Sequence, residues 1–215
     1  MTEAEMVDAF RIHYDIANLD GPEYEDNEIY PLLNNAQVIV VLDKLRKGEL
    51  SHITNVIENE TGNLAAGLAF SNTRRFTPTE EYIGFISAKM KGTRTTFKAT
   101  GSDVWMECEL IHKSRSGKYL TNTLNVPILL KPKVYEDNDK TFIVIYDNYT
   151  APLTTAGFLL EYVRKPEDIA SGVDCELNEI VHEDIVSLAV NLAKQVFNPQ
   201  EAAIDAGVDK EIKNR

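Results

Sequence analysis

The stretch Cys175-Glu-Leu-Asn-Glu-Ile-Val-His-Glu-Asp-Ile-Val-Ser-Leu-Ala-Val-Asn-Leu-Ala-Lys-Gln-Val-Phe197 carries the clearest helix pattern in the sequence. Apolar residues recur at spacings of three and four, so one helical face holds Leu177, Val181, Ile185, Leu188, Leu192 and Val196. Acidic residues gather in the first turns, where the helix dipole favours negative charge: Glu176, Glu179, Glu183 and Asp184. Asn198-Pro199 ends the pattern, because proline cannot continue the hydrogen-bond ladder. We therefore predict an amphipathic helix whose apolar face needs a partner.

The segment before this helix, Leu159-Leu-Glu-Tyr-Val-Arg164, is predicted to be a strand that stops before Pro166. At the other end of the chain, Thr2-Glu-Ala-Glu5 has the spacing of a capping box and predicts a first helix over residues 3–18. The positions of this helix expected to share a face are Met6, Ala9, Phe10, His13, Ile16 and Ala17.

A second helix is predicted from Asp26 or Asn27 to Gly48. Its apolar face carries Ile29, Leu32, Leu33, Ala36, Val40 and Leu45. The run Val38-Ile-Val-Val-Leu42 is mostly β-branched and by propensity alone would suit a strand. The polar and charged residues on either side favour a helix that is buried on much of its circumference.

Residues 49–59 predict a shorter third helix, with Leu50, Ile53, Val56 and Ile57 on one face. From Asn63 onward the sequence becomes rich in Thr, Ser, Gly and β-branched residues, which is typical of antiparallel strands. Strands are predicted at residues 82–90, 104–112, 133–136, 141–146 and 159–164, with an extended segment at 125–132. Turns are predicted at residues 113–118 and 137–139.

This order of elements predicts an α+β fold in which N- and C-terminal helices form one layer around an inserted antiparallel β block, sandwich-like or barrel-like. The expected division is a helical layer of residues 1–62 and 170–198, a β domain of residues 63–169, and a C-terminal arm of residues 199–215. The C-terminal helix is expected to bury its apolar face against the N-terminal helices.

Composition excludes several classes of protein. The chain has 215 residues, 43% hydrophobic and 26% charged, which is ordinary for a globular protein. No apolar run is long enough to cross a membrane, and the acidic beginning does not resemble a secretory signal, so export is not expected. Cys108 and Cys175 match no metal or redox spacing and are expected to be reduced, packed thiols.

The net charge of -12 argues against tight wrapping of nucleic acid. Its distribution is uneven: residues 1–69 carry 4 basic and 13 acidic residues, residues 70–135 carry 11 and 5, and residues 136–215 carry 7 and 16. A cationic middle between two anionic ends suits head-to-tail association of copies of one chain. A lysine-rich but merely solvated surface is the alternative.

Motifs for catalysis are missing: the sequence contains no nucleophile elbow, phosphate-binding loop or dinucleotide fingerprint. We predict no catalytic residue, no cofactor and no metal. Glu-x-x-His occurs twice, ending at His52 and His182, but the chain lacks the further long helices that a di-iron bundle requires. Asp137-Asn-Asp139 lacks the glycine and glutamate of a calcium loop and suits a hairpin turn. Aromatic residues could form a sugar-binding face, although core packing explains them as well: Trp105, Tyr135, Tyr146, Tyr149 and Tyr162.

Two stretches resemble structural proteins of crAss-like podoviruses that infect gut Bacteroidetes. One is Asp26-Asn-Glu-Ile-Tyr-Pro-Leu-Leu-Asn-Asn-Ala-Gln37, similar to an acidic or polar cap before a Leu-Asn-x-Ala-Gln helix. The other begins at Tyr162-Val-Arg-Lys-Pro-Glu-Asp-Ile169 and continues through residues 175–190, similar to a recurring ending of these chains. About thirty residues match, and residues 63–80 match nothing in the family's pattern.

The resemblance implies a non-enzymatic ring protein of the head-to-tail connector, similar to the gatekeeper or tail-tubular proteins of other podoviruses. Such a protein forms a homo-oligomeric ring of about twelve copies, contacts the portal and adjacent tail proteins, and surrounds passing DNA without reading its sequence. It is located in the neck or tail of the virion and is assembled in the host cytoplasm. A tail-tube or stopper ring lower in the stack, and a glycan-binding module carried on the β block, are the alternatives.

Charged residues supply the candidate subunit contacts. Those expected on a cationic side are Arg74, Arg75, Lys89, Lys91 and Arg94, and those on an anionic side are Glu176, Glu179, Glu183 and Asp184. Polar residues beside the apolar face of the second helix are expected at the same contact: Asp26, Asn34 and Gln37.

Overall fold

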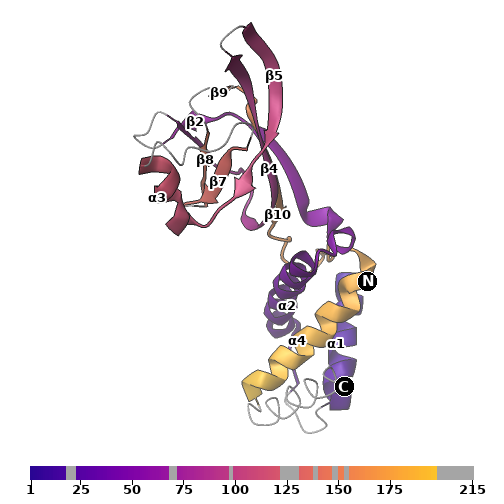
Figure 1. Ribbon diagram of the computed structural model, residues 1–215. Coiled ribbons are helices and arrows are strands. Elements are labelled where there is room, and N and C mark those ends of the chain that lie inside the picture. The colour runs from indigo at the N-terminus through magenta and orange to yellow at the C-terminus, as the bar shows by residue number, and fades with distance from the viewer. Residues whose placement is uncertain are drawn as a thin grey trace, which may run out of the picture. The chain divides into compact units, whose positions relative to one another are not determined.

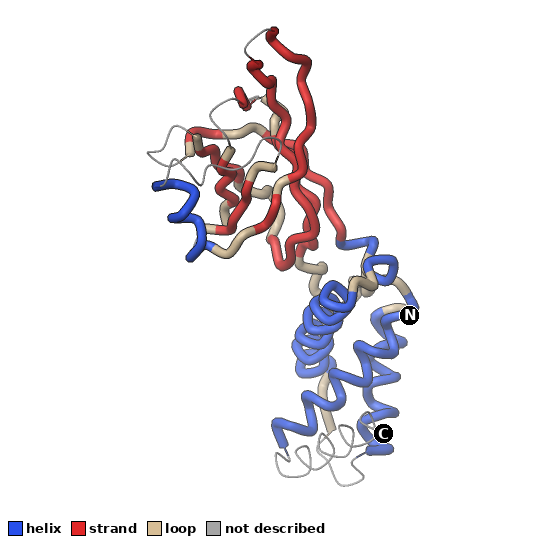
Figure 2. Tube along the Cα trace, in the orientation of Figure 1, coloured by secondary structure: helices blue, strands red, loops and turns tan. Residues whose placement is uncertain are grey.

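The structure is a computed structural model that describes residues 1–17, 23–67, 72–96, 99–121, 131–137, 140–146, 150–152 and 155–197. The chain folds into two compact units. The helical unit consists of Met1–Val56 and the chain from Lys165 onward, and the β unit consists of Ile57–Arg164. Figure 2 shows the separation of the two kinds of secondary structure between these units, with one helix, α3, belonging to the β unit. The predicted α+β fold, with helices at both ends of an inserted antiparallel β block, is confirmed.

The described part of the helical unit contains three long helices: α1 (Glu3–Ala17), α2 (Asp26–Lys47) and α4 (His182–Phe197). The predicted capping box begins α1, because the Thr2 amide donates to Glu5 Oε2 at 2.7 Å and the Glu5 amide donates to Thr2 Oγ1 at 3.3 Å. Gly48 ends α2 in the left-handed conformation, at φ 73°. The ambiguous run at residues 38–42 is helical throughout.

The C-terminal helix begins later than predicted. Residues 175–178 precede it, a 3₁₀ turn (η4, Glu179–Val181) follows, and α4 starts at His182. The reason is a local cap: the Asn178 side chain accepts a hydrogen bond from the Ile180 amide at 3.2 Å, which ends the non-helical segment there. Glu176 and Glu179 therefore lie before α4, and only Glu183 and Asp184 occupy its first turn.

The buried face of α4 is also wider than predicted, because this helix packs against both α1 and α2 (Figure 1). Leu188 and Leu192 are only half-buried. Complete or near-complete burial falls instead on Val181, Ile185, Val186, Ala189, Val190 and Ala193. Because Ala189 and Ala193 are small, the backbone of α4 can approach its neighbouring helices closely at these positions. A search for regularly spaced large apolar residues does not detect this contact.

The predicted third helix is wrong. Two single 3₁₀ turns, η1 (Leu50–His52) and η2 (Thr54–Val56), lead into a strand, β1 (Ile57–Gly62). This strand pairs with β10 from Ile57↔Val163 to Gly62↔Phe158, and sheet pairing decides its conformation. The unit boundaries accordingly fall after Val56 and Arg164, and not after residues 62 and 169.

The β unit contains two five-stranded sheets. The first has the order β1-β10-β4-β5, with β9 also paired to β4; its further strands are β4 (Tyr82–Thr96), β5 (Ala99–Glu107), β9 (Thr150–Pro152) and β10 (Phe158–Arg164). The second has the order β2-β3-β8-β7-β6, with β2 (Ala65–Ala66), β3 (Thr73–Phe76), β6 (Glu109–Leu110), β7 (Lys133–Glu136) and β8 (Phe142–Ile145). The β7–β8 hairpin was predicted, whereas β1, β2, β3 and β9 were not.

One apolar core lies between the two sheets, which makes the β unit a sandwich. Its buried members come from both sheets: Leu64, Phe76, Ala88, Met90, Met106, Val134, Phe142, Val144, Tyr146, Phe158, Leu160 and Tyr162. The chain crosses between sheets just after β5, where the Cys108 amide still donates to Ala88 of the first sheet and the Glu109 amide already donates to Pro132.

The predicted turn at residues 113–118 is a helix, α3 (Lys113–Thr121). His112 supports its first turn, since its carbonyl accepts from the Arg115 amide at 2.8 Å. Tyr119 and Leu120 of this helix pack on a second apolar cluster, formed by Ile111, Tyr135, Ile143 and Ile145. The β8 strand is thereby buried on both faces, and this tertiary contact outweighs the turn-forming serines and glycine. Of the predicted extended segment 125–132, residues 125–130 lie outside the described residues.

Gly62 fits a close approach in the sandwich, and its replacement by alanine is expected to destabilise the β unit by about 1–3 kcal/mol. A Cβ atom at this position would lie 2.1 Å from Cε2 of the buried Phe76 ring, which itself contacts Phe158 with ring centroids 4.9 Å apart. Urea unfolding monitored by Trp105 fluorescence measures the loss. Gly117→Ala in α3 is the matched control: a Cβ there meets no described atom within 4 Å, so stability should stay constant or rise. Equal destabilisation by both variants would contradict the argument.

Candidate functional site

The β5 strand forms an open edge of the first sheet in the described part of the chain, since its only described partner is β4. Trp105 lies opposite Lys91 in this pair. The Lys91 amide donates away from β5, to Gly157 at 2.8 Å, so Lys91 and Trp105 form a non-hydrogen-bonded pair. The backbone amide and carbonyl of Trp105 therefore point outward, toward the open edge. Such an edge can accept an extended peptide as an additional strand.

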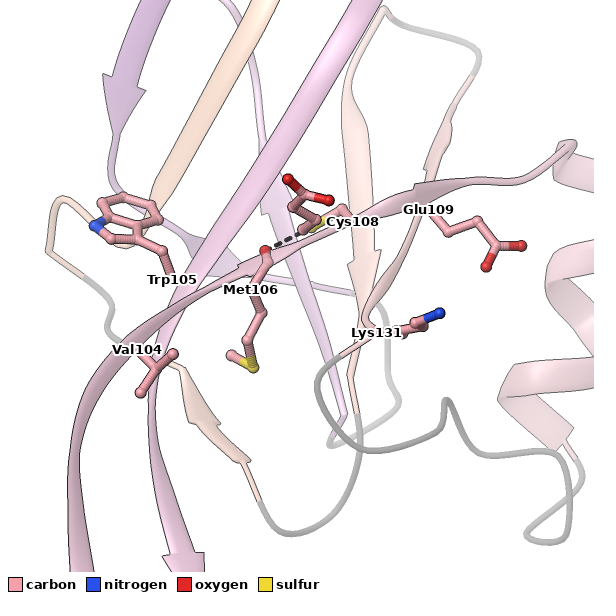
Figure 3. A pocket seen from close by; sticks show the side chains of 7 residues that line it. Val104, Trp105, Met106, Cys108, Glu109 and Lys131 are labelled. Atoms are coloured by element: carbon pink, nitrogen blue, oxygen red, sulfur yellow. Dashed lines mark hydrogen bonds between the residues drawn. The ribbon is translucent and has the colours of Figure 1, made fainter.

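A pocket of about 460 Å³ runs beside this edge and is lined by Val104–Glu109 and Lys131 (Figure 3). Figure 3 shows Trp105 and Met106 projecting from opposite sides of the strand. Val104 and Trp105 are 45% and 43% exposed, which is unusual for such large apolar side chains. Lys91 covers part of the indole, with Nζ 6.0 Å from the ring centroid, and lies 3.8 Å from Asp103. The pocket thus combines apolar contact surface with charges of both signs.

Cys108 lines this pocket and is predicted to react slowly with alkylating agents. Burial raises the pKa of its thiol to about 12, and burial also raises the pKa of the Cys175 thiol. Because the thiolate is the nucleophile, native protein at about pH 8 should react with iodoacetamide roughly a thousandfold more slowly at Cys108 than protein unfolded in urea. Mass spectrometry of timed samples measures both sites. Rapid modification of Cys108 in the native protein would contradict this prediction.

The five predicted cationic residues lie on two different sheets. Arg74 and Arg75 belong to β3, while Lys89, Lys91 and Arg94 belong to β4. Arg74 is half-buried, with its guanidinium 5.8 Å from the Tyr146 ring centroid and Nη1 donating to the Thr73 carbonyl at 2.9 Å. Arg75 is exposed, and the Arg94 side chain lies outside the described atoms. Among the side chains that the structure describes, Arg74 and Arg75 thus belong to a different sheet from Lys89 and Lys91.

Three of the four predicted acidic residues contact their own helical unit. Glu176 Oε1 accepts from the Glu167 amide at 2.5 Å, Asp184 lies 3.1 Å from Lys44 Nζ, and Glu183 lies 3.4 Å from His13 Nε2. Glu179 is exposed and has no ion-pair partner among the described residues. Glu179, Glu183 and Asp184 are exposed, whereas Glu176 is half-buried; of the three exposed residues, Glu179 is the one without an ion pair in the described ranges.

The two Glu-x-x-His motifs do not meet in a metal site. His182 is buried, its Nε2 donates to the Leu177 carbonyl at 2.9 Å, and its Nδ1 lies 2.8 Å from the amino nitrogen of Met1. Its partner in the motif, Glu179, points to solvent. His52 lies 3.4 Å from Glu49 within its own turn. Among the described residues, no three His, Cys, Asp or Glu side chains are grouped as a metal site would require.

The aromatic residues do not form a shared binding face. Tyr135, Tyr146 and Tyr162 are buried in the β unit, so Trp105 alone of the described members is substantially exposed. Tyr149 lies outside the described residues, as do Asn138 and Asp139 of the predicted 137–139 turn. Asp137 is 2.5 Å from Lys113 Nζ.

Asn34 and Gln37, which were predicted to lie at a subunit contact, hold the helical unit together. Asn34 Nδ2 donates to the Ile169 carbonyl at 3.1 Å, and the Ile169 amide donates to Asn34 Oδ1 at 2.7 Å. Gln37 is 1% exposed; it donates to the Glu167 carbonyl at 2.9 Å and accepts from Cys175 Sγ at 3.1 Å. Asp26 forms an ion pair with Arg11. The stretches 26–37 and 162–190, far apart in sequence, are thus in direct contact.

Sequence periodicity missed the exposed apolar residues, including Val104, Leu110, Ile12 and Ile16. Ile16 was predicted on the buried face of α1 and is 76% exposed. The buried residues of α1 are Met6, Val7, Phe10 and Tyr14, a face rotated from the predicted one. The sequence did contain a signal for this exposed pair. Met6, Val7, Phe10 and Tyr14 already form a complete apolar face of the helix, so Ile12 and Ile16, four residues apart, form a second apolar surface beside it.

Comparison with protein-family models and with curated proteins found no match to this chain. The helices in the described ranges are all too short or too polar to cross a lipid bilayer.

Proposed function

We propose that the chain is a structural, non-enzymatic virion protein that forms a ring in the head-to-tail connector of a crAss-like podovirus, joining portal to tail around the DNA channel. The observation that carries the proposal is the pair of stretches, residues 26–37 and 162–190, that resemble this family. Their contact supports it: Asn34 and Gln37 of the first stretch bind the backbone of Ile169 and Glu167 in the second. The resembling residues therefore belong to one structural feature.

The distribution of charge is also compatible with a ring. The total of -12 suits a channel through which DNA slides without being held. A ring subunit needs two different, complementary surfaces, and the anionic, cationic and anionic thirds of the sequence provide candidates. The protein would then be located in the neck or tail of the virion.

Mass photometry and electron microscopy of the purified chain, alone and mixed with its portal protein, test the proposal. Rings of about twelve copies are expected, and crosslinking to the portal would distinguish a portal-proximal ring from a lower one. A chain that stays monomeric at every concentration, with and without the portal, would contradict the proposal.

The anionic side of the contact remains a prediction for Glu179 and Glu183. We expect Glu179→Lys with Glu183→Lys to weaken ring formation at low salt and to have little effect at high salt, because exposed charges are screened. Native mass spectrometry over a salt series measures the effect. Glu167→Lys is the control for charge alone, because it is a charge reversal of the same sign at an exposed residue of the helical unit outside the predicted contact, and equal weakening by it would dismiss Glu179 and Glu183.

A further inference from the structure

The outer face of α1 is partly apolar. Ile12 and Ile16 are 58% and 76% exposed, and a spacing of four residues puts them on the same side of the helix. The exposed residues Asp8 and Asp15 lie on the same side of the helix. Asp8 is four residues before Ile12, and Asp15 is three residues after it, so each is about one helical turn away. Asp15 has no ion-pair partner among the described residues. We call Asp8, Ile12, Asp15 and Ile16 the α1 ridge.

A groove of about 550 Å³ lies between α2 and α4 of the same unit. We call it the α2–α4 groove; it is lined by Ile39, Val40, Leu42, Asp43, Lys44, Arg46, Lys47, Asp184 and Leu188. Ile39 is 44% exposed and Leu188 is half-buried, so part of its floor is accessible apolar surface. No residue of α1 lines it. The ridge and the groove are therefore separate surfaces.

Most charges around the groove are already paired. Lys47 lies 2.6 Å from Asp43, and Lys44 lies 3.1 Å from Asp184, whose hydrogen bond raises the pKa of the lysine. Arg46 is exposed and forms no ion pair within the described ranges. The rim thus presents a guanidinium without an ion pair in the described ranges. On the α1 ridge, Asp8 lies 3.8 Å from Arg11 of the same helix, so Asp15 supplies the unpaired carboxylate beside the isoleucines. The two surfaces match in both apolar character and charge.

We propose that the α1 ridge of one copy docks into the α2–α4 groove of a second copy. This inference rests on the proposed ring and names the contact that would build it. Because ridge and groove are different surfaces of one chain, the contact is heterologous: each copy can use both, and repetition gives a closed ring or an open filament. Burial of Ile12 and Ile16 supplies apolar contact, and Arg46 fixes the orientation by meeting a carboxylate of the ridge.

Two variants of the full chain test this contact. The ridge variant carries Ile12→Lys and Ile16→Lys, and the groove variant carries Ile39→Asp and Arg46→Glu. Each is expected to weaken association about a hundredfold or more, since central apolar and arginine contacts dominate interfaces. Val173→Lys is the matched control, because Val173 is 38% exposed in the same unit and belongs neither to these two surfaces nor to the contact predicted for Glu179 and Glu183. Circular dichroism checks that all three variants remain folded. If the groove variant does not fold, Arg46→Glu alone, assayed at low salt, takes its place.

Mixing the two variants gives the decisive result. Each alone should be monomeric, but the mixture should form a one-to-one dimer and nothing larger, because one intact ridge then meets one intact groove. Sedimentation velocity or mass photometry measures this.

The possible outcomes separate the contact from the ring. Rings that persist in either variant, or a mixture without dimers, would overturn the proposed contact but would not contradict the proposed ring. Loss of portal binding with intact rings would assign the surfaces to another partner and also overturn it. A monomeric wild-type chain would overturn both this proposal and the proposed function, whereas wild-type filaments broken by the variants would support only the contact.

Discussion

Replacing Phe142 with alanine is expected to destabilise the β unit by about 3–5 kcal/mol, the usual loss when a buried aromatic ring is removed from a core. Phe142 is fully buried between the two sheets. Its ring meets Tyr82 edge to face at a centroid distance of 5.2 Å and lies 6.0 Å from Phe85. Alanine would leave a cavity between the two sheets.

Urea unfolding followed by fluorescence measures this loss, since Trp105 is the single tryptophan of the chain and lies in the β unit. Leu110→Ala is the control: Leu110 is 49% exposed, so its truncation should change stability by no more than about 0.5 kcal/mol. Similar midpoints for the Phe142 variant and the wild type would show that the two sheets do not share the core described above.

The second large effect is expected at Asn34. Asn34→Leu removes both hydrogen bonds to the Ile169 backbone and leaves an amide and a carbonyl without a partner. Each such buried group costs about 1–3 kcal/mol. The helical unit should therefore lose several kcal/mol, which far-ultraviolet circular dichroism during thermal or urea unfolding would detect.

Asn35→Leu is a closely matched control for this experiment. Asn35 is the next residue of the same helix and is exposed, so the substitution has the same chemistry without the lost contacts. Its effect should be small. If Asn34→Leu and Asn35→Leu behaved alike, the segment around Ile169 would not depend on α2, and the proposed role of Asn34 would be wrong.

Sequence reasoning located α1, α2 and α4 because their signals are local. The capping box of Thr2 and Glu5, the left-handed Gly48 and the periodicity of residues 181–193 each act within a few residues. It failed where distant partners decide. The segment 57–62 has no strand pattern of its own and becomes β1 by pairing with β10, and residues 113–121 form α3 because Tyr119 and Leu120 cover sheet residues.

The candidate surfaces were harder to predict, since accessibility depends on what the fold covers. Asn34 and Gln37 are polar residues beside an apolar stripe, which is equally typical of a subunit contact and of a buried hydrogen-bond anchor; the structure shows the second. Ile16 fits a helical apolar face by spacing, yet α1 turns Phe10 and Tyr14 inward and leaves Ile16 outside. Only the packing of α4 against α1 and α2 selects between these faces.

The arrangement of the two units also sets an order of events during synthesis. The β unit is one continuous segment of the sequence, Ile57–Arg164. Helices α1 and α2 precede this segment in the chain, and their partner helix α4 follows it. On the ribosome the first two helices emerge earliest but lack the surface that covers their apolar faces until α4 appears. The sandwich can therefore complete its fold first, and the helical unit closes last. Nascent α1 and α2 therefore keep apolar residues such as Phe10 and Leu33 without the cover of α4 throughout this interval.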